Sequence, residues 1–200
     1  TKVTVSYPGE IVNISTEGIT GAWATVTYSG KTGYIVNSYL LPSPPPKAGI
    51  ETMKQYLAQL SPTFGTKLVV KNGTMNNIEE GGWELRKQLY KNGGEWHEFV
   101  GYEYNSDTYF VPLFTIEQAF ILLRLIPEFK EVFDNTAEFP SKSKTIKKGE
   151  VEYEIKVDTE MIGDNPWIKK ISVGFADGAM YDFQIYTIEN QVVIFYGSGV

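Results

Sequence analysis

The stretch Trp23–Leu40 constrains the fold more than any other part of the chain. Residues 23–28 alternate between two sets of side chains, as a strand with one set on each face requires. The pair Ser29-Gly30 follows, and glycine accepts the positive φ of a tight turn at low cost. A second short run, residues 33–36, comes directly after the turn. The stretch therefore predicts a β-hairpin within a small all-β unit.

Three motifs in this region resemble the last half of bacterial SH3-like domains. They are Gly21-Ala22-Trp23, Gly30-Lys31-Thr32-Gly33-Tyr34 and Ser38-Tyr39-Leu40. The family has a similar order: a small residue with Trp, an alternating strand, a Gly-Lys-Thr-Gly-aromatic turn and a Ser-x-Tyr-Leu ending. Upstream, Lys2–Val5 and Glu10–Ser15 are predicted strands joined by a turn at Pro8-Gly9. The family usually opens with a further strand and an arginine-containing loop. Residues 1–41 lack both, so the resemblance implies an N-terminally truncated SH3-like domain in a fragment or a processed chain.

The resemblance implies a binding module. SH3-like domains generally bind extended peptides across an aromatic-lined groove, and their bacterial relatives usually belong to cell-wall or envelope proteins, several of which bind peptidoglycan peptides. It places the candidate ligand-binding residues at Trp23, Tyr28, Tyr34 and Tyr39. Filling the core of a small barrel is the alternative role for Trp23 and Tyr39. The expected partner is a peptide, peptidoglycan or an envelope protein. The expected location is the periplasm, the cell surface or the medium, after removal of a signal peptide.

The composition argues against several other classes of protein. The 200 residues include no Cys, so no disulfide, thiolate nucleophile or thiolate metal ligand is expected. The net charge of −6 argues against nucleic acid and anionic lipid as partners, because both require a basic face. No apolar run approaches the roughly 18 residues of a membrane-spanning helix. An apolar fraction of 42%, with 4 Trp, 13 Tyr and 11 Phe, is enough for a sizeable core.

A proline-rich segment divides the chain into two predicted domains. Residues 42–47 read Pro-Ser-Pro-Pro-Pro-Lys, and consecutive prolines favour polyproline II, a stiff extended conformation. We therefore expect a rigid spacer between the SH3-like domain, residues 1–41, and a second domain, residues 48–200.

The second domain is predicted to be an α+β domain with an antiparallel sheet. One helix is expected to end before Pro62, and another to start at Thr115, whose spacing to Gln118 is that of a capping box. Alternating runs and turn pairs such as Asn-Gly predict strands over residues 66–70, 83–90, 96–104, 108–111, 145–157, 167–175, 180–186 and 192–196, with a turn at 105–107. The halves 48–113 and 114–200 each contain a helix and about four strands, a pattern that suggests a duplicated helix-plus-four-strand unit.

Few catalytic sites can be assembled from these residues. The one His, His97, cannot supply the two or three imidazoles of a typical zinc hydrolase, and no Gly-x-Ser-x-Gly motif is present. The lack of Cys excludes cysteine peptidases and L,D-transpeptidases. No cofactor or metal is expected. Paired carboxylates on strands leave a cell-wall glycan hydrolase as an alternative, with Glu98 and Glu152 as residues to test. A solvated sheet face explains the same carboxylates equally simply.

Trp83 and Trp96 are the remaining candidate ligand-binding residues. Tryptophan suits carbohydrate and protein contacts because it combines an apolar ring with a hydrogen-bond donor. Ordinary strand propensity accounts for aromatic residues in these runs as well. The sequence therefore predicts a non-catalytic bacterial envelope or secreted protein with a binding or adaptor role. The alternatives are the glycan hydrolase and a structural protein whose SH3-like unit only packs on the second domain.

Overall fold

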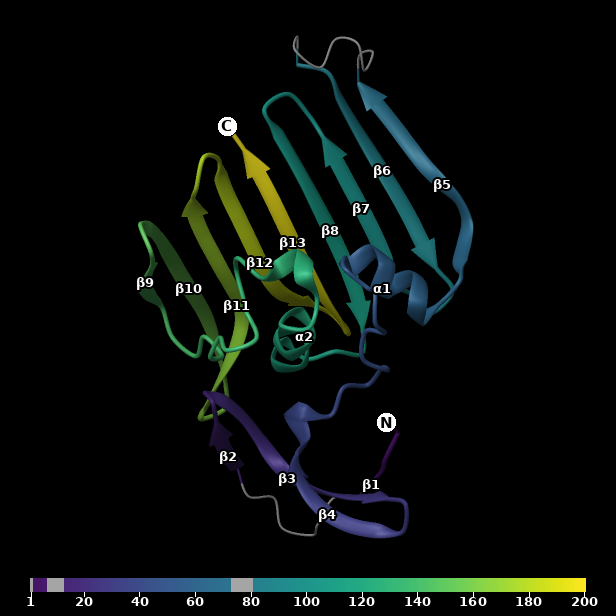
Figure 1. The fold of residues 1–200 in the computed structure, drawn as a ribbon, viewed down its shortest axis with the longest axis vertical. Helices are drawn as coiled ribbons and strands as arrows, with labels where there is room; N and C mark the ends of the chain where they lie inside the picture. Colours follow the sequence, from purple (N-terminus) through teal and green to yellow (C-terminus); the bar gives the residue numbers. More distant parts are fainter. Residues whose placement is uncertain (1, 7–12, 73–80) are drawn as a thin grey trace.

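The computed structural model describes residues 2–6, 13–72 and 81–200, which form a protein built mainly of β-strands (Figure 1). Of the residues that the structure describes, 55% lie in strands and 12% in helices. A small N-terminal sheet lies at one end of the molecule, and a single large sheet makes up most of the remainder.

The N-terminal sheet is organised around one long strand. Its elements are β1 (Thr4–Ser6), β2 (Asn13–Thr16), β3 (Ile19–Tyr28) and β4 (Lys31–Val36), followed by the 3-10 helix η1 (Asn37–Tyr39). Strand β2 pairs with the first half of β3, and β1 and β4 flank its second half. The predicted hairpin is confirmed, with positive φ at both Ser29 and Gly30. The predicted turn at Pro8-Gly9 lies outside the described residues.

The strands from β5 onward form one nine-stranded antiparallel sheet. They are β5 (Thr63–Asn72), β6 (Trp83–Tyr90), β7 (Glu95–Val100), β8 (Tyr104–Pro112), β9 (Lys144–Lys148), β10 (Val151–Ile162), β11 (Asn165–Ala176), β12 (Met180–Ile188) and β13 (Gln191–Gly199). Their spatial order is β5-β6-β7-β8-β13-β12-β11-β10-β9. The chain therefore builds the sheet from one edge to the centre, crosses one face to the other edge, and returns to the centre.

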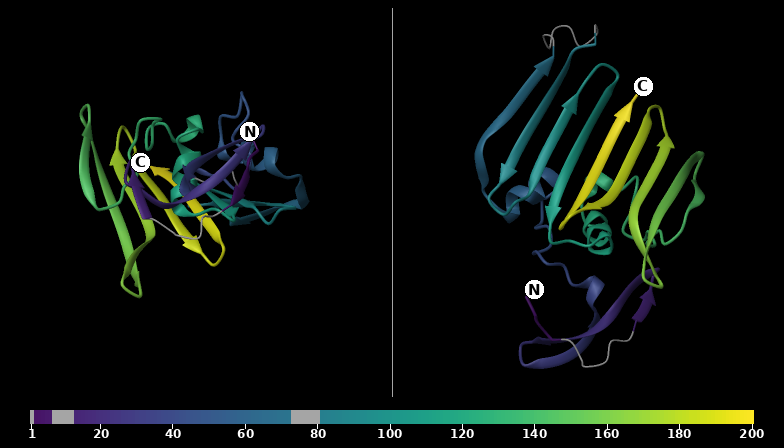
Figure 2. Two further views of the ribbon diagram at one scale, coloured as in Figure 1. Left: turned by 90° about the horizontal axis from the view of Figure 1, so that it is seen from below. Right: turned by 180° about the vertical axis from the view of Figure 1, so that it is seen from behind.

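The helices lie on one face of the large sheet. These elements are α1 (Met53–Leu60), α2 (Ile116–Leu123) and the 3-10 helix η3 (Pro127–Phe129). The view from behind shows the opposite face without helices among the described residues (Figure 2). We call the two surfaces the helix-bearing face and the helix-free face. No helix in the described part of the chain is long and apolar enough to cross a bilayer.

Local sequence signals explain where both α-helices begin. Each starts with a capping box, in which a Thr side chain and a Gln side chain satisfy backbone N–H groups reciprocally. The pair Thr115 and Gln118 was predicted, and the equivalent pair at α1 is Thr52 and Gln55.

The main core fills the space between the helices and the sheet. Phe129 and Phe133 contact Phe183 of β12 at ring-centroid distances of 5.7 and 5.3 Å. Phe120, within α2, is fully buried in the same core. Ile19 of β3 is also fully buried there, so the N-terminal sheet packs against the large-sheet unit.

The predicted α+β fold class with a duplicated helix-plus-four-strand unit is wrong. The described residues contain two α-helices of eight residues each, and the strands of residues 63–199 form one sheet. The reason is the pairing of β8 with β13, which runs from Pro112 opposite Gln191 to Tyr104 opposite Gly199. This pairing joins the halves 48–113 and 114–200 through backbone hydrogen bonds, so they are not separate units.

One turn lies elsewhere than predicted, and another was not predicted. The turn expected at residues 105–107 lies at 101–103, where the Gly101 N–H donates to the Tyr104 carbonyl at 2.9 Å and Glu103 has a φ of 55°. Residues 105–107 belong to β8. The strand expected over 145–157 is divided by a turn at Gly149, whose φ of 62° reverses the chain between β9 and β10.

The proline-rich segment is bound along α1. The Tyr56 hydroxyl donates to the Pro44 carbonyl at 2.9 Å, and Gln59 Nε2 donates to the Pro45 carbonyl at 3.1 Å. The Lys47 N–H donates to Gln59 Oε1 at 2.8 Å. These contacts hold the segment against the second domain, so it is not a free spacer.

Candidate functional site

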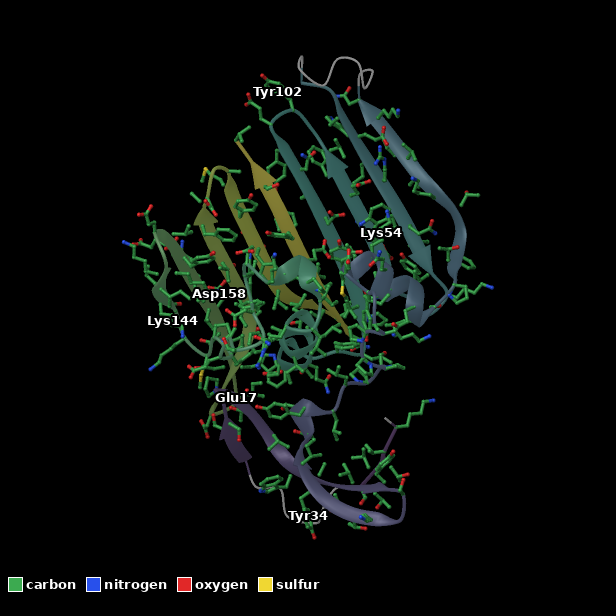
Figure 3. All side chains as sticks on the ribbon, viewed as in Figure 1. Glu17, Tyr34, Lys54, Tyr102, Lys144 and Asp158 are labelled. Atoms are coloured by element: carbon green, nitrogen blue, oxygen red, sulfur yellow. The ribbon has the colours of Figure 1, made fainter. Side chains whose placement is uncertain are left out.

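The N-terminal sheet separates the four aromatic residues predicted to bind a ligand. Thr25 lies opposite Tyr34 and Trp23 lies opposite Val36, so Trp23 and Tyr34 are diagonal neighbours on one face. Trp23 is 38% exposed and Tyr34 is 70% exposed, and the Tyr34 side chain points away from the large sheet (Figure 3). Strand alternation puts Tyr28 on the opposite face. The strands therefore bring together only one exposed aromatic pair, Trp23 and Tyr34.

Tyr39 lies where the N-terminal unit meets the second domain. Its hydroxyl donates to the Thr16 carbonyl at 3.3 Å and lies 3.5 Å from Glu17 Oε2. Burial raises the pKa of Tyr39, and the nearby Glu17 carboxylate raises it further. Tyr39 thus contributes its ring to the junction and uses its hydroxyl to hold the β2–β3 turn.

Polar contacts from α2 fix this junction. Gln118 Nε2 donates to the Leu40 carbonyl at 2.7 Å, while Gln118 Oε1 accepts the Thr115 N–H of the capping box at 3.1 Å. Arg124 forms an ion pair with Glu17 at 3.4 Å. One glutamine therefore both starts α2 and holds the end of the N-terminal unit.

A groove of about 620 Å³ lies beside this junction, and we call it the junction groove. Strand β1 and the two residues before it form one wall, the segment that starts at the end of η1 forms another, and α2 with the residues that follow it forms the third. The lining residues are Lys2, Val3, Val5, Tyr39, Leu40, Leu41, Pro42, Ser43, Pro44, Pro45, Ile121 and Leu125. Leu125 is 50% exposed, so the groove opens to solvent over an apolar surface.

The chemistry of the junction groove suits binding and offers little for bond cleavage. Of its lining residues, Lys2 carries the only charge at neutral pH, and none has a carboxylate or an imidazole. Most of the other side chains are aliphatic or proline. Ligand pockets typically combine such an apolar lining with a few polar groups that fix orientation. Lys2 and the Tyr39 hydroxyl supply those groups here.

A second group of polar side chains lies on the helix-bearing face of β5–β7. Glu84 is almost fully buried and is contacted by Lys71 at 2.9 Å and by Arg86. Arg86 also contacts Glu98 at 2.7 Å. Hydrogen bonds from Lys71 and Arg86 lower the pKa of Glu84. These charges are paired with one another, which is typical of a structural network.

Trp96 belongs to the core of the helix-bearing face, although the sequence suggested it as a ligand-binding residue. It is 2% exposed, and its Nε1–H donates to Asp107 at 2.6 Å. The Lys54 ammonium lies 3.5 Å from the centre of its ring. Burial raises the pKa of Asp107. The indole N–H is therefore already bonded to Asp107, and one face of the ring is covered by Lys54.

Glu128 connects three elements close to Trp96. Its carboxylate accepts the Met53 N–H at the start of α1 at 2.7 Å and the Tyr109 hydroxyl of β8 at 3.0 Å. Burial raises the pKa of Glu128. A carboxylate from η3 thus stabilises the N-terminus of α1, where a negative charge is favoured.

The carboxylates suggested for glycan hydrolysis are not brought together. Glu98 lies on the helix-bearing face opposite Asp107, whereas Glu152 alternates with the buried Tyr153 and lies on the helix-free face. His97 lies on the helix-free face, 2.9 Å from Glu95, and burial lowers its pKa. The described residues contain no group of three or more His, Asp or Glu that could bind a metal. Wall hydrolysis stays a prediction that none of these placements favours.

Trp83 lies on the helix-free face. It stacks on Phe99 with a centroid distance of 6.1 Å and is half-buried. Leu85 and Leu89 share the face with it, because alternate residues of β6 point the same way. Trp83 is therefore part of an apolar sheet surface. It is not among the residues that line the junction groove.

Sequence reasoning identified Tyr39 but missed the junction groove. The groove is lined by residues near the start of the chain and by Ile121 and Leu125. No local sequence pattern predicts that these two regions lie side by side. The one available signal was the Thr115–Gln118 capping box, which places α2 correctly. Comparison with known proteins adds nothing to the assignment, because no protein-family model, curated protein or solved structure matches this chain.

Proposed function

We propose that this protein is a non-catalytic binding or adaptor protein of the bacterial envelope, whose N-terminal part is an SH3-like module. The observation that carries the proposal is the junction groove, an open apolar groove formed jointly by the N-terminal unit, the proline-rich segment and α2. An extended peptide is the ligand class that such a groove fits, because apolar side chains can fill it while the backbone stays in solvent.

The charge of the groove narrows the ligand further. Lys2 is its only charged lining residue, so a ligand that brings a carboxylate to Lys2 and has small apolar side chains is complementary to the groove. A nucleotide would require more cations for its phosphates, and a sugar would require more hydrogen-bonding side chains than Ser43 and Tyr39. Peptidoglycan stem peptides and segments of envelope proteins both have the required chemistry, and the resemblance to bacterial SH3-like domains supports the same class.

Binding to purified peptidoglycan fragments and free stem peptides tests the proposal. The variant Leu125→Glu places a negative charge in the groove at a half-exposed position, so the fold should tolerate it. We expect calorimetry to show an affinity for stem peptides at least about tenfold weaker than that of the unmodified protein. Met180→Glu is the matched control, since Met180 is 74% exposed and lies on β12, outside the groove lining.

Two results would contradict the proposal in different ways. If Trp23→Ala and Tyr34→Ala abolish binding while Leu125→Glu has no effect, the ligand lies on the exposed aromatic pair and the groove is not its site. If the unmodified protein binds neither wall fragments nor peptides from an envelope extract, the N-terminal unit has only its packing role on the second domain.

A further inference from the structure

Strand β5 forms an open edge of the large sheet. It is one of the two end strands in the spatial order and pairs with β6 along one side. All ten of its residues, Thr63–Asn72, are exposed. Among the described residues, no strand pairs with its outer side, so backbone N–H and C=O groups along that side lack a strand partner.

The other edge of the sheet, β9, is better protected than β5, although β5 contains two lysines and an irregularity in its pairing between Phe64 and Leu68. Strand β9 has five residues, and three of them are lysines. Lys148 is also held by the nearby loop, 3.7 Å from Asp134. Short length and lysines are the usual means by which edge strands avoid pairing with other chains. Strand β5 is twice as long and presents Phe64, Leu68, Val69 and Val70, each at least 40% exposed.

The apolar surface of β5 continues onto the helix-free face. Val70 lies opposite Leu85, and Phe64 lies opposite Leu89. At the end of this surface is a hollow of about 510 Å³ lined by Phe64, Leu89, Tyr90, Lys91, Gly93, Gly94 and Glu95. A strand added outside β5 would place alternate side chains on the helix-free face, where Leu68 and Val70 lie, and the hollow is adjacent to that path.

From these features we propose that β5 captures an extended segment of a partner protein by strand addition, a function separate from the junction groove. The segment alternates apolar residues, which cover Leu68 and Val70 on the helix-free face, with acidic residues near Lys67 and Lys71. The charge of β5 supports acidic residues, since the strand contains these two lysines and no carboxylate. Lys71 already pairs with Glu84 of β6, so Lys67 is the cation that the acidic residues of the segment would reach. A second copy fits less well, because antiparallel pairing of two β5 strands would bring four lysines to one seam.

A synthetic ten-residue peptide that alternates glutamate and valine tests this proposal. Its control is a peptide of the same composition with all glutamates in one block. We expect fluorescence anisotropy to detect binding of the alternating peptide only, and hydrogen exchange to slow in β5. Leu68→Glu should weaken binding at least about tenfold, because it removes apolar contact and repels the acidic peptide. Met161→Glu, at a similarly exposed apolar position on β10, should leave binding unchanged.

Other results would overturn the proposal. Equal binding of the two peptides, no binding of either, or slowed exchange only outside β5 would each contradict it. Sedimentation that shows a dimer of the unmodified protein and a monomer of Leu68→Glu would assign the edge to a second copy. The two proposals fail independently, because Leu125→Glu alters the junction groove without touching β5 and Leu68→Glu does the reverse.

Discussion

Phenylalanine residues on the two faces of the large sheet differ in burial. On the helix-bearing face, Phe183 is fully buried between Phe129 and Phe133. On the helix-free face, Phe64 is 60% exposed and borders a hollow. A strand pattern alone does not distinguish these environments, because both residues alternate with neighbours of the opposite face. The difference is made by the helices, which cover one face and leave the other available for contacts with other molecules.

The largest expected difference between the faces is in packing. Phe183→Ala should lower the free energy of unfolding by about 3–5 kcal/mol, because it removes a fully buried ring and leaves a cavity. Phe64→Ala should lower it by no more than about 0.5 kcal/mol, as expected for an exposed position. Urea unfolding of both variants provides the measurement. Equal losses would mean that the helix-free face is covered in solution.

A smaller difference is expected between two carboxylates, one on each side of the sheet. Glu128→Ala leaves the Met53 N–H and the Tyr109 hydroxyl without their protein acceptor and should cost about 1–3 kcal/mol of unfolding free energy. Glu95→Ala removes half-exposed contacts to Lys87 at 2.6 Å and His97 at 2.9 Å, so it should cost less than about 1 kcal/mol. Thermal unfolding at neutral pH compares them, and a reversed order would show that the helix-bearing network is dispensable.

The smallest expected effect is an opposite pH dependence of the same two carboxylates. Burial raises the pKa of Glu128 above its ordinary value of 4.5. The part of its contribution that depends on protonation is therefore present below 4.5 and is lost as pH rises through the raised pKa. For Glu95, burial acts in the same direction, but hydrogen bonds from Lys87 and His97 outweigh it and lower the pKa. Its contribution is present above 4.5 and is lost as pH falls through the lowered pKa.

Glutamine variants isolate these two contributions. Between about pH 4 and pH 7, the stability of the unmodified protein relative to Glu128→Gln should decrease as pH rises. Its stability relative to Glu95→Gln should increase as pH rises through the lowered pKa toward 4.5 and should change little above that pH. Denaturant titrations at several pH values give both slopes, and slopes of the same sign would refute the assignment of opposite shifts.

Local patterns in the sequence predicted the parts of the fold that local interactions determine. The capping box at Thr115 places α2, and the alternation along β10 correctly indicates that Tyr153 and Ile155 are buried. The hairpin at Ser29-Gly30 follows from turn chemistry in the same way. These features are determined by residues close together in the sequence, so they can be predicted from the sequence alone.

The features that the sequence did not reveal depend on distant pairing. The pairing of β8 with β13 decides that there is one sheet, and it joins residues 104–112 to residues 191–199. Likewise, the alternation of side chains along β7 does not predict which of its two faces the helices cover. Trp96 therefore read as a candidate ligand contact, although Lys54 and Asp107 enclose it.

The position of β13 has a consequence for the order of folding during synthesis. This strand lies between β8 and β12 at the middle of the sheet, yet it is made after both of its neighbours. Until residues 191–199 leave the ribosome, β8 and β12 each lack the strand that pairs with their inner edge in the folded sheet. The long separation between β8 and β13 makes closure of this gap a late and slow step. The edges of β8 and β12 that face each other thus stay without a strand partner until β13 has been made.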